Sequence, residues 1–347
     1  MHAAISTFTE TCDQIAHAGL KLRIIIIKVF ATFLFTRKWL NIMAKQNGAH
    51  SLFSRLLLLL VSASFTINVS ARPDMTPLGP NIADTGSAYY HFSTQTFDSA
   101  DGNRHYKVWI AQPDKAPPAA GYPVIYMLDG NAVMNKLSEP LLQQLSQGNP
   151  PLLVVVGYQT TLPFDVIART FDYTPPDKEH GSVGYTFSRG RTGGGSELFR
   201  ALLEQRIAPA AERGVKVNQQ QRALWGHSYG GLFVLDSYLS SSFFSHYYAA
   251  SPSIGQGYAS LLSQLQALTA QQAGAKQLTL MEGNGDSRRD PHSAKTDVLR
   301  AVPSTVNQMA AHQLVAHYQL YPGLSHGQMF GASLQHTLTT VAQSATP

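Results

Sequence analysis

The sequence predicts an α/β fold, with a mostly parallel central sheet, helices on both faces and a β-hairpin at the N-terminal end. Residues 123–128 and 152–156 are short, fully apolar runs, which are typical of strands buried on both faces of such a sheet. Beyond residue 196, predicted strands and helices alternate along the chain. A glycine-rich motif, Gly226-His-Ser-Tyr-Gly230, stands where one of these strands gives way to a helix.

Periodicity and turn residues define the other elements. Residues 89–98 and 105–111 alternate polar and apolar side chains around the turn sequence Asp98-Ser-Ala-Asp-Gly-Asn, which predicts the hairpin. Residues 158–195 hold prolines and glycines with little periodicity, so we expect a long loop there that is either functional or mobile. After this loop the expected strands are 221–225, 247–250, 277–281 and 317–321, and the expected helices are 196–212, 232–239, 258–268, 295–313 and 328–341.

Residues 43–71 have the layout of a secretory signal peptide. Lys45 and Arg55 supply positive charge, residues 56–61 form the apolar run, and Val69-Ser-Ala71 matches a small-x-small cleavage site. We therefore expect cleavage after Ala71 and a periplasmic location for the mature protein.

Three further segments complete the expected organisation. Residues 72–87 are rich in Pro, Gly and Asn and are expected to be a linker, and residues 88–347 form the predicted enzyme domain. Residues 1–42 have two interpretations. Either the start is mis-assigned and Met43 is the true initiator, or they form an N-terminal membrane segment, although Lys28 interrupts their apolar run. No later run approaches the length of a membrane span, so we expect no stable membrane insertion of the mature chain.

Charge and cysteine content exclude several function classes. The chain has 26 Lys and Arg against 21 Asp and Glu, but seven of the basic and two of the acidic residues precede residue 72, which leaves 19 of each. A neutral domain gives no reason to expect a nucleic-acid partner. The single cysteine, Cys12, lies in the leader, which excludes a cysteine nucleophile and a zinc–thiolate site in the mature chain.

Ser228 is the candidate nucleophile. In a G-x-S-x-G motif the serine occupies a sharp, strained turn between a strand and a helix, which exposes its hydroxyl. The glycines at positions 226 and 230 fit this turn, because we expect that side chains there would collide with neighbouring backbone. The N-terminus of the following helix adds positive potential where a carbonyl oxygen gains charge during attack. The motif alone is a weak signal, and the strand and helix around it strengthen it.

His326 is the candidate base for this serine. Where a fold carries such an elbow, the chain order is nucleophile, acid, histidine, and the histidine follows the last strand. His326 lies in the loop Tyr321-Pro-Gly-Leu-Ser-His, between the last expected strand and the final helix. By contrast, His312, His317 and His336 fall in expected helices or strands, where surface or structural roles are the rule.

The acid and the oxyanion donors complete the expected site. Asp286 and Glu282 both follow the strand 277–281, and Arg288 and Arg289 nearby could pair with them instead. Asp286 is the first candidate, Glu282 the second, and the alternative is a Ser–His dyad or an acid from elsewhere. The main-chain N–H groups of Asn131, after the strand 123–128, and of Tyr229 are the expected oxyanion donors.

Six segments together resemble a known family of α/β-hydrolases. Three of them resemble its esterase-D-like branch, and the other three narrow this to the periplasmic siderophore esterases; the resemblance covers residues 88–345. The first three are Gly226-His-Ser-Tyr-Gly-Gly-Leu-Phe, Leu128-Asp-Gly and Pro322-Gly-Leu-Ser-His-Gly, and the others are Asp172-Tyr-Thr-Pro-Pro, Gly193-Gly-Gly-Ser-Glu-Leu-Phe and Tyr248-Ala-Ala-Ser-Pro-Ser.

The resemblance implies hydrolysis of the trilactone of enterobactin or salmochelin, without a metal cofactor in the chemistry. We expect linear products and no other cofactor, and the sequence predicts no protein partner. The resemblance also implies that a Ser–His dyad suffices and that Arg169 contacts the anionic catecholate substrate, with which a guanidinium can pair or stack. A structural ion pair of Arg169 with Asp172 or Asp165 is the alternative. The competing functions are a general carboxylesterase or thioester hydrolase, an acyltransferase, and a siderophore-binding protein without catalysis.

Overall fold

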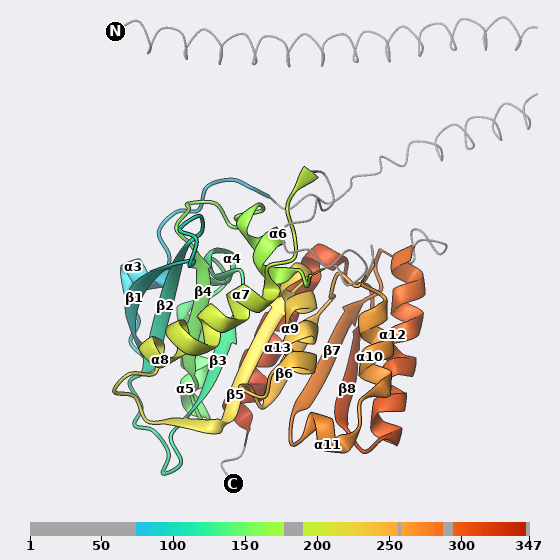
Figure 1. Cartoon of the computed structure of the whole chain (residues 1–347). Helices are drawn as coiled ribbons and strands as arrows, with labels where there is room; N and C mark the ends of the chain where they lie inside the picture. The colour runs from blue at the N-terminus through green and yellow to red at the C-terminus, as the bar shows by residue number, and fades with distance from the viewer. Residues whose placement is uncertain (1–73, 177–189, 256–257, 287–293, 345–347) are drawn as a thin grey trace, which may run out of the picture. The chain divides into compact units, whose positions relative to one another are not determined.

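An eight-stranded sheet runs through the protein in the order β1-β2-β4-β3-β5-β6-β7-β8 (Figure 1). β1 pairs antiparallel with β2, and β2 with β4, whereas every other neighbouring pair is parallel. The predicted hairpin and mostly parallel sheet are thus confirmed. The strands are β1 (Tyr90–Asp98), β2 (His105–Pro113), β3 (Tyr122–Met127), β4 (Leu152–Tyr158), β5 (Val217–His227), β6 (His246–Ala250), β7 (Gln277–Gly283) and β8 (Val315–Tyr321).

This computed structural model describes residues 74–176, 190–255, 258–286 and 294–344, which belong to the unit Ala71–Pro347. The predicted extension 1–42 and signal peptide 43–71 lie outside the described residues. In the described part of the chain, no helix combines the length and the apolar character that a bilayer span requires.

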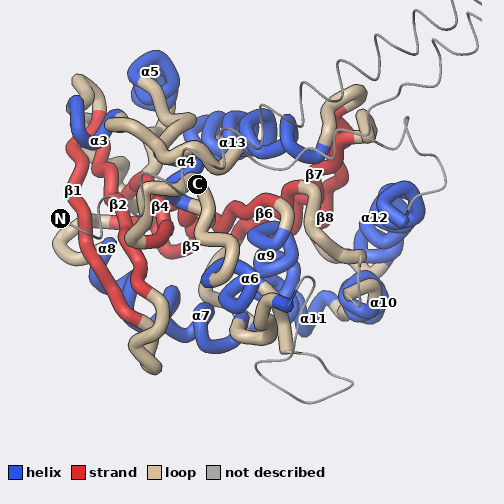
Figure 2. The backbone as a smooth tube through the Cα atoms, turned by 90° about the horizontal axis from the view of Figure 1, so that it is seen from above, coloured by secondary structure: helices blue, strands red, loops and turns tan. Residues whose placement is uncertain are grey.

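Helices cover both faces of the sheet (Figure 2). The alternating side chains of each buried strand explain this arrangement: Val124 and Tyr126 of β3 enter one hydrophobic cluster, and Ile125 and Met127 enter the other. One face carries α4 (Gly130–Met134), α5 (Glu139–Gln147) and α13 (His326–Gln343), and the other carries α6 (Ala168–Tyr173), α7 (Ser196–Leu202), α9 (Tyr229–Ser240), α10 (Ser260–Ala267) and α12 (Ala294–Ala311).

The expected helix 196–212 is interrupted in the structure. α7 continues into a π-helical turn, η2 (Leu203–Ile207), and then into α8 (Ala208–Ala211). Pro209 explains the wider turn, because it has no N–H to donate and its ring would press on the carbonyl of the preceding turn.

Several short helices were not predicted, because four to nine residues carry too little periodicity to reveal them. They include α4, α5 and α6, together with α3 (Ile82–Thr85) in the predicted linker and α11 (Ala270–Ala273). A capping box between Asn81 and Asp84 supports α3.

The parallel strands all end at one edge of the sheet. The segments that follow β3, β5, β6, β7 and β8 therefore meet there, which is where open α/β sheets bind ligands. These segments contain Asp129, Ser228, Ser253, Asp286 and His326.

Candidate active site

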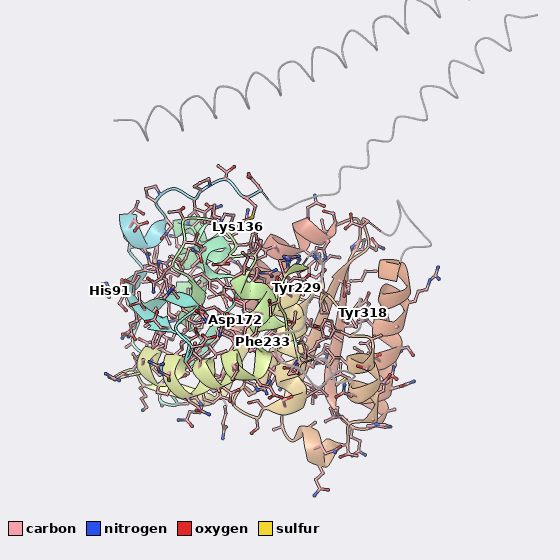
Figure 3. The ribbon with its side chains drawn as sticks, turned by 45° about the horizontal axis from the view of Figure 1, so that its top comes forward. His91, Lys136, Asp172, Tyr229, Phe233 and Tyr318 are labelled. Carbon is pink, nitrogen blue, oxygen red and sulfur yellow. The ribbon has the colours of Figure 1, made fainter. Side chains whose placement is uncertain are left out.

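Ser228 occupies the sharp turn between β5 and α9. Its backbone is in a left-handed region, with φ 61° and ψ −115°, and its side chain is half-buried. An L-residue adopts this conformation only where the surroundings impose it, and such strain is common at functional sites. Tyr229 begins α9 directly after it, and Phe233 follows one turn farther along the helix (Figure 3).

The glycines around the elbow do not all serve the predicted purpose. A Cβ on Gly226 would overlap the backbone of Gly230, as expected. A Cβ on Gly230, however, would make only an ordinary contact, 3.5 Å from the Cβ of Leu128, so the predicted collision is wrong for this position. The tighter second position is Gly231, where a Cβ would lie 2.8 Å from the carbonyl oxygen of Ala250. The elbow is therefore packed against the end of β6.

His326 lies beside the serine. Its Nε2 is 3.1 Å from Ser228 Oγ, although 98 residues separate the two in the sequence. The imidazole belongs to the first residue of α13, which Ser325 caps by accepting a hydrogen bond from the N–H of Gln328. An imidazole in this position can accept the serine proton, so the structure brings together the two residues expected to form a dyad.

Both main-chain groups of His326 are fixed. The Asp286 carboxylate accepts a hydrogen bond from its N–H at 2.7 Å. His227, the residue before the serine, donates its Nε2–H to the His326 carbonyl at 2.8 Å. Burial, and secondarily the nearby His326 ring, lower the pKa of His227 well below its ordinary value, so this ring is neutral at neutral pH. No sequence signal indicated the role of His227.

Asp286, the first candidate acid, thus accepts a hydrogen bond from the backbone N–H of His326. The hydrogen bond sets the position of the first turn of α13 and, through it, the position of the imidazole. The predicted arrangement was different, because there the carboxylate contacts the imidazole ring and orients it.

The expected oxyanion donors begin two helices at the same edge of the sheet. Tyr229 is the first residue of α9, and Asn131 is the second residue of α4, so both main-chain N–H groups lie in the first turn of a helix, where the helix dipole favours negative charge. The Asn131 side chain fixes its own position, because it donates to the carbonyls of Tyr158 and Thr160 and accepts from the N–H of Tyr158.

Arg169 of α6 forms a buried ion pair with Asp129. Its Nε and Nη2 donate to the two carboxylate oxygens at 2.7 and 2.8 Å, and the side chains are 10% and 1% exposed. The expected alternative partners, Asp172 and Asp165, are therefore wrong. The guanidinium carbon also lies 5.2 Å from the ring centroid of Tyr229, so Arg169 links the end of β3 to the residue after the nucleophile.

Asp172, in the same helix as Arg169, pairs with a different arginine. It forms an ion pair with Arg104 at 3.0 Å and accepts hydrogen bonds from the hydroxyls of Tyr106 and Tyr158, both at 2.9 Å. These contacts tie α6 to β2 and β4, which holds Arg169 in place. Figure 3 labels Asp172.

Comparison with known families and structures identifies the type of protein. The Esterase family model matches residues 99–341, which is more than half of the chain. The chain belongs to the esterase family. It is 50% identical to the apo-salmochelin esterase of Escherichia coli O6:H1 over 274 residues, covering 79% of this chain and 86% of that protein.

Solved structures support the same assignment. Two structures of the enterobactin and salmochelin hydrolase IroE, one of them a complex with DFP, are 48% identical with a TM-score of 0.68, covering 76% of this chain and all of theirs. By sequence, the chain is also similar to the ferri-bacillibactin esterase BesA of Bacillus subtilis, with 36% identity over 163 residues, covering 45% of this chain and 56% of BesA. The α/β-hydrolase fold and the expected serine hydrolase class are thereby confirmed.

Glu282, the second candidate acid of this esterase, is almost fully buried at the end of β7. Burial raises its pKa to about 8, against an opposing effect of the Ser251 hydroxyl. The carboxyl group is therefore protonated at neutral pH. An acid that orients and stabilises an imidazolium must be ionised, so Glu282 does not fit that role.

Glu282→Gln should leave the esterase active and change the pH dependence of its stability. The pKa of Glu282 is about 8 in the folded state, above its ordinary value of 4.5, so protonation of this carboxyl group favours the folded state. This contribution to stability is fully present below about pH 4.5 and is lost as the pH rises through 8. The glutamine variant keeps the shape of the protonated acid and does not titrate. Its Tm should match the wild type near pH 5 and exceed it by a few degrees near pH 9. Parallel Tm profiles, or a loss of esterase activity, would contradict this account.

In the described residues of the esterase, no three His, Cys, Asp or Glu side chains lie close enough together to hold a metal ion. The sequence also gave no indication of one neighbour of Ser228, Ser253, whose Oγ lies 3.1 Å from Ser228 Oγ.

Proposed function

We propose that this protein is a serine esterase that opens the trilactone of a catecholate siderophore of the enterobactin or salmochelin type, with Ser228 as nucleophile and His326 as general base. The observation that carries the mechanism is the 3.1 Å contact between Ser228 Oγ and His326 Nε2 at a strained elbow. The substrate class is supported by the 50% identical apo-salmochelin esterase and by the similarity to IroE.

Acylation begins when His326 Nε2 takes the Ser228 proton and Oγ attacks a lactone carbonyl. The N–H groups of Tyr229 and Asn131 stabilise the negative charge on the carbonyl oxygen. As the carbonyl re-forms, the ring C–O bond breaks and the imidazolium returns its proton to the departing alkoxide. Because that alkoxide is part of the same ring, the acyl-enzyme carries the whole opened siderophore.

Deacylation repeats these steps with water. His326 removes a proton from the water molecule, the hydroxide attacks the ester carbonyl, and Ser228 Oγ departs and recovers a proton from His326. The first product is a linear siderophore with one new carboxyl group and one new hydroxyl group, heavier than the substrate by one water.

Arg169 is the proposed substrate contact. Asp129 accepts two of the five N–H hydrogens of its guanidinium, so others are available to an anionic catecholate at the partly exposed side of the group. Phe164, Tyr173 and Tyr229 lie around the guanidinium, each with its ring centroid 5.2–5.5 Å from the central carbon. These aromatic rings restrict its movement. Tyr173 is fully buried, and the half-buried Phe164 and Tyr229 offer surfaces to an aryl substrate.

Mass analysis of reaction products tests the proposed substrate. The protein should convert enterobactin, and the salmochelin type likewise, first into a linear species heavier by one water. Any further cut should release shorter linear fragments whose masses sum to that of the substrate plus one water for each ester cut. kcat/KM for the siderophore should exceed that for a short p-nitrophenyl ester. The reverse order of rates would favour a general carboxylesterase, and transfer to an added alcohol in preference to water would favour an acyltransferase.

A further inference from the structure

The nucleophile has a second hydroxyl partner. Ser228 Oγ lies 3.1 Å from His326 Nε2 and also 3.1 Å from the Oγ of Ser253, in the segment that follows β6. Ser253 is half-buried, and the proposed mechanism assigns it no step. A hydroxyl this close to an attacking oxygen affects both the direction in which that oxygen's proton points and the charge that it can carry.

The fold fixes the position of Ser253 through its backbone. The Ser253 N–H donates to the Ser228 carbonyl at 3.1 Å, and the Ser228 N–H donates to the Ala250 carbonyl at 2.9 Å. Between these two hydrogen bonds, Ser251 adopts φ 41°, in the left-handed region that non-glycine residues rarely occupy, and donates its N–H to the Met281 carbonyl at 2.7 Å. Residues 250–253 are therefore held by hydrogen bonds to the elbow at Ser228 and to Met281 of β7.

Gly231 makes the close approach possible. A Cβ at this position would lie 2.8 Å from the Ala250 carbonyl oxygen and 3.1 Å from the Cα of Pro252. The glycine in the first turn of α9 thus lets the segment that carries Ser253 pack directly on the helix that follows the nucleophile. This packing brings the Ser253 hydroxyl within hydrogen-bonding distance of the Ser228 hydroxyl.

The number of hydroxyl protons determines which of the two serines donates the hydrogen bond between them. The Ser228 hydroxyl has one hydrogen, and it must point at His326 Nε2 if the imidazole is to accept it. The hydrogen bond between the two serines is then donated by Ser253 and accepted by Ser228. In the opposite arrangement Ser228 would donate to Ser253, and its proton would point away from the base.

We propose that Ser253 is a positioning residue that donates a hydrogen bond to Ser228 Oγ, directing the Ser228 proton to His326 and stabilising the negative charge on Oγ. The charge develops twice, when the proton leaves during acylation and when Oγ departs from the acyl group during deacylation. No bond to Ser253 forms or breaks. The inference rests on the proposed role of Ser228 as nucleophile.

A set of three Ser253 variants isolates the hydroxyl. Thr and Val have nearly the same shape and differ in the presence of the hydroxyl, so they form a matched pair, and Ala removes the group entirely. We expect Ser253→Ala and Ser253→Val to lower kcat about tenfold, as for the loss of one hydrogen bond to a charged group, with KM unchanged. Ser253→Thr should recover most of the rate. The rate of covalent labelling by a fluorophosphonate should follow the same order.

Each outcome of this experiment decides the proposal. Ala and Val variants with reduced kcat and slow labelling, together with a Thr variant near the wild type, support it. An Ala variant at the wild-type rate overturns it, and so does an equal loss in all three variants, which would indicate packing alone. Turnover by Ser228→Ala would instead overturn the proposed nucleophile, so the two failures are distinguishable. Ser146→Ala, at a half-buried serine of α5 that the proposed mechanism does not use, is the control and should match the wild type.

Discussion

Replacing Ser228 with alanine is expected to lower kcat/KM for siderophore hydrolysis by roughly four to six orders of magnitude, the scale observed for loss of a serine nucleophile. The hydroxyl supplies the bond to the acyl group, so no neighbouring residue can substitute for it. The fold should persist, because the substitution leaves the hydrogen bonds of the elbow backbone to Ala250 and Ser253 unchanged. Product formation by mass and thermal unfolding are the two measurements.

His326→Ala should cause a loss of similar size, because the two residues act as one unit in the proposed mechanism. The double variant should then be little worse than either single one. If instead Ser228→Ala retained substantial turnover, the proposed nucleophile would be wrong.

Replacing Arg169 with alanine is expected to destabilise the fold by about 3–5 kcal/mol, because it leaves the Asp129 carboxylate buried without its partner. Asp129 is 2% exposed and adopts φ 54° at the junction of β3 and α4. Movement of this junction would also displace the N–H of Asn131, so kcat should fall in addition to the loss of stability. Urea unfolding and steady-state kinetics measure the two effects.

Two comparison variants make the Arg169 prediction specific. Adding Asp129→Asn to Arg169→Ala removes the unpaired charge and keeps a residue type that tolerates the left-handed backbone, so the double variant should be more stable than Arg169→Ala. Arg206→Ala, at an exposed arginine of η2, should change stability by less than about 0.5 kcal/mol. An Arg169→Ala variant as stable as Arg206→Ala would contradict the structural importance of the pair.

The elements that the sequence predicted well are those whose signal is local. Ser228 could be placed at a strand-to-helix elbow because a motif, an apolar strand and a helix occur close together in the chain. His326 could be placed near Ser228 because the junction of the last strand and the last helix has a fixed place in the topology, although His326 is the first residue of α13 and does not lie in the expected loop. The order of the strands in the sheet is β1-β2-β4-β3-β5-β6-β7-β8. It depends on which distant segments pair, and the pattern of polar and apolar residues along the chain does not determine this.

The partners of charged residues could not be predicted, because they depend on tertiary geometry. Arg169 had several carboxylates within reach along the chain, and its partner Asp129 is 40 residues away, at a turn whose backbone conformation no pattern indicates. Asp286 was placed in the right loop, but the sequence cannot distinguish a contact with the His326 backbone from one with its ring. Ser253 approaches the nucleophile because of the unusual backbone of Ser251, which leaves no signal in the sequence.

Trapping the acyl-enzyme tests the central claim most directly. The protein is mixed with intact enterobactin, the reaction is stopped rapidly with acid, and the mass of the protein and of its peptides is measured. Ring opening releases no leaving group, so the expected adduct has the mass of one whole substrate molecule and lies on the peptide that contains Ser228, while Ser228→Ala shows none. An adduct on another residue, or siderophore turnover by Ser228→Ala, would contradict the claim.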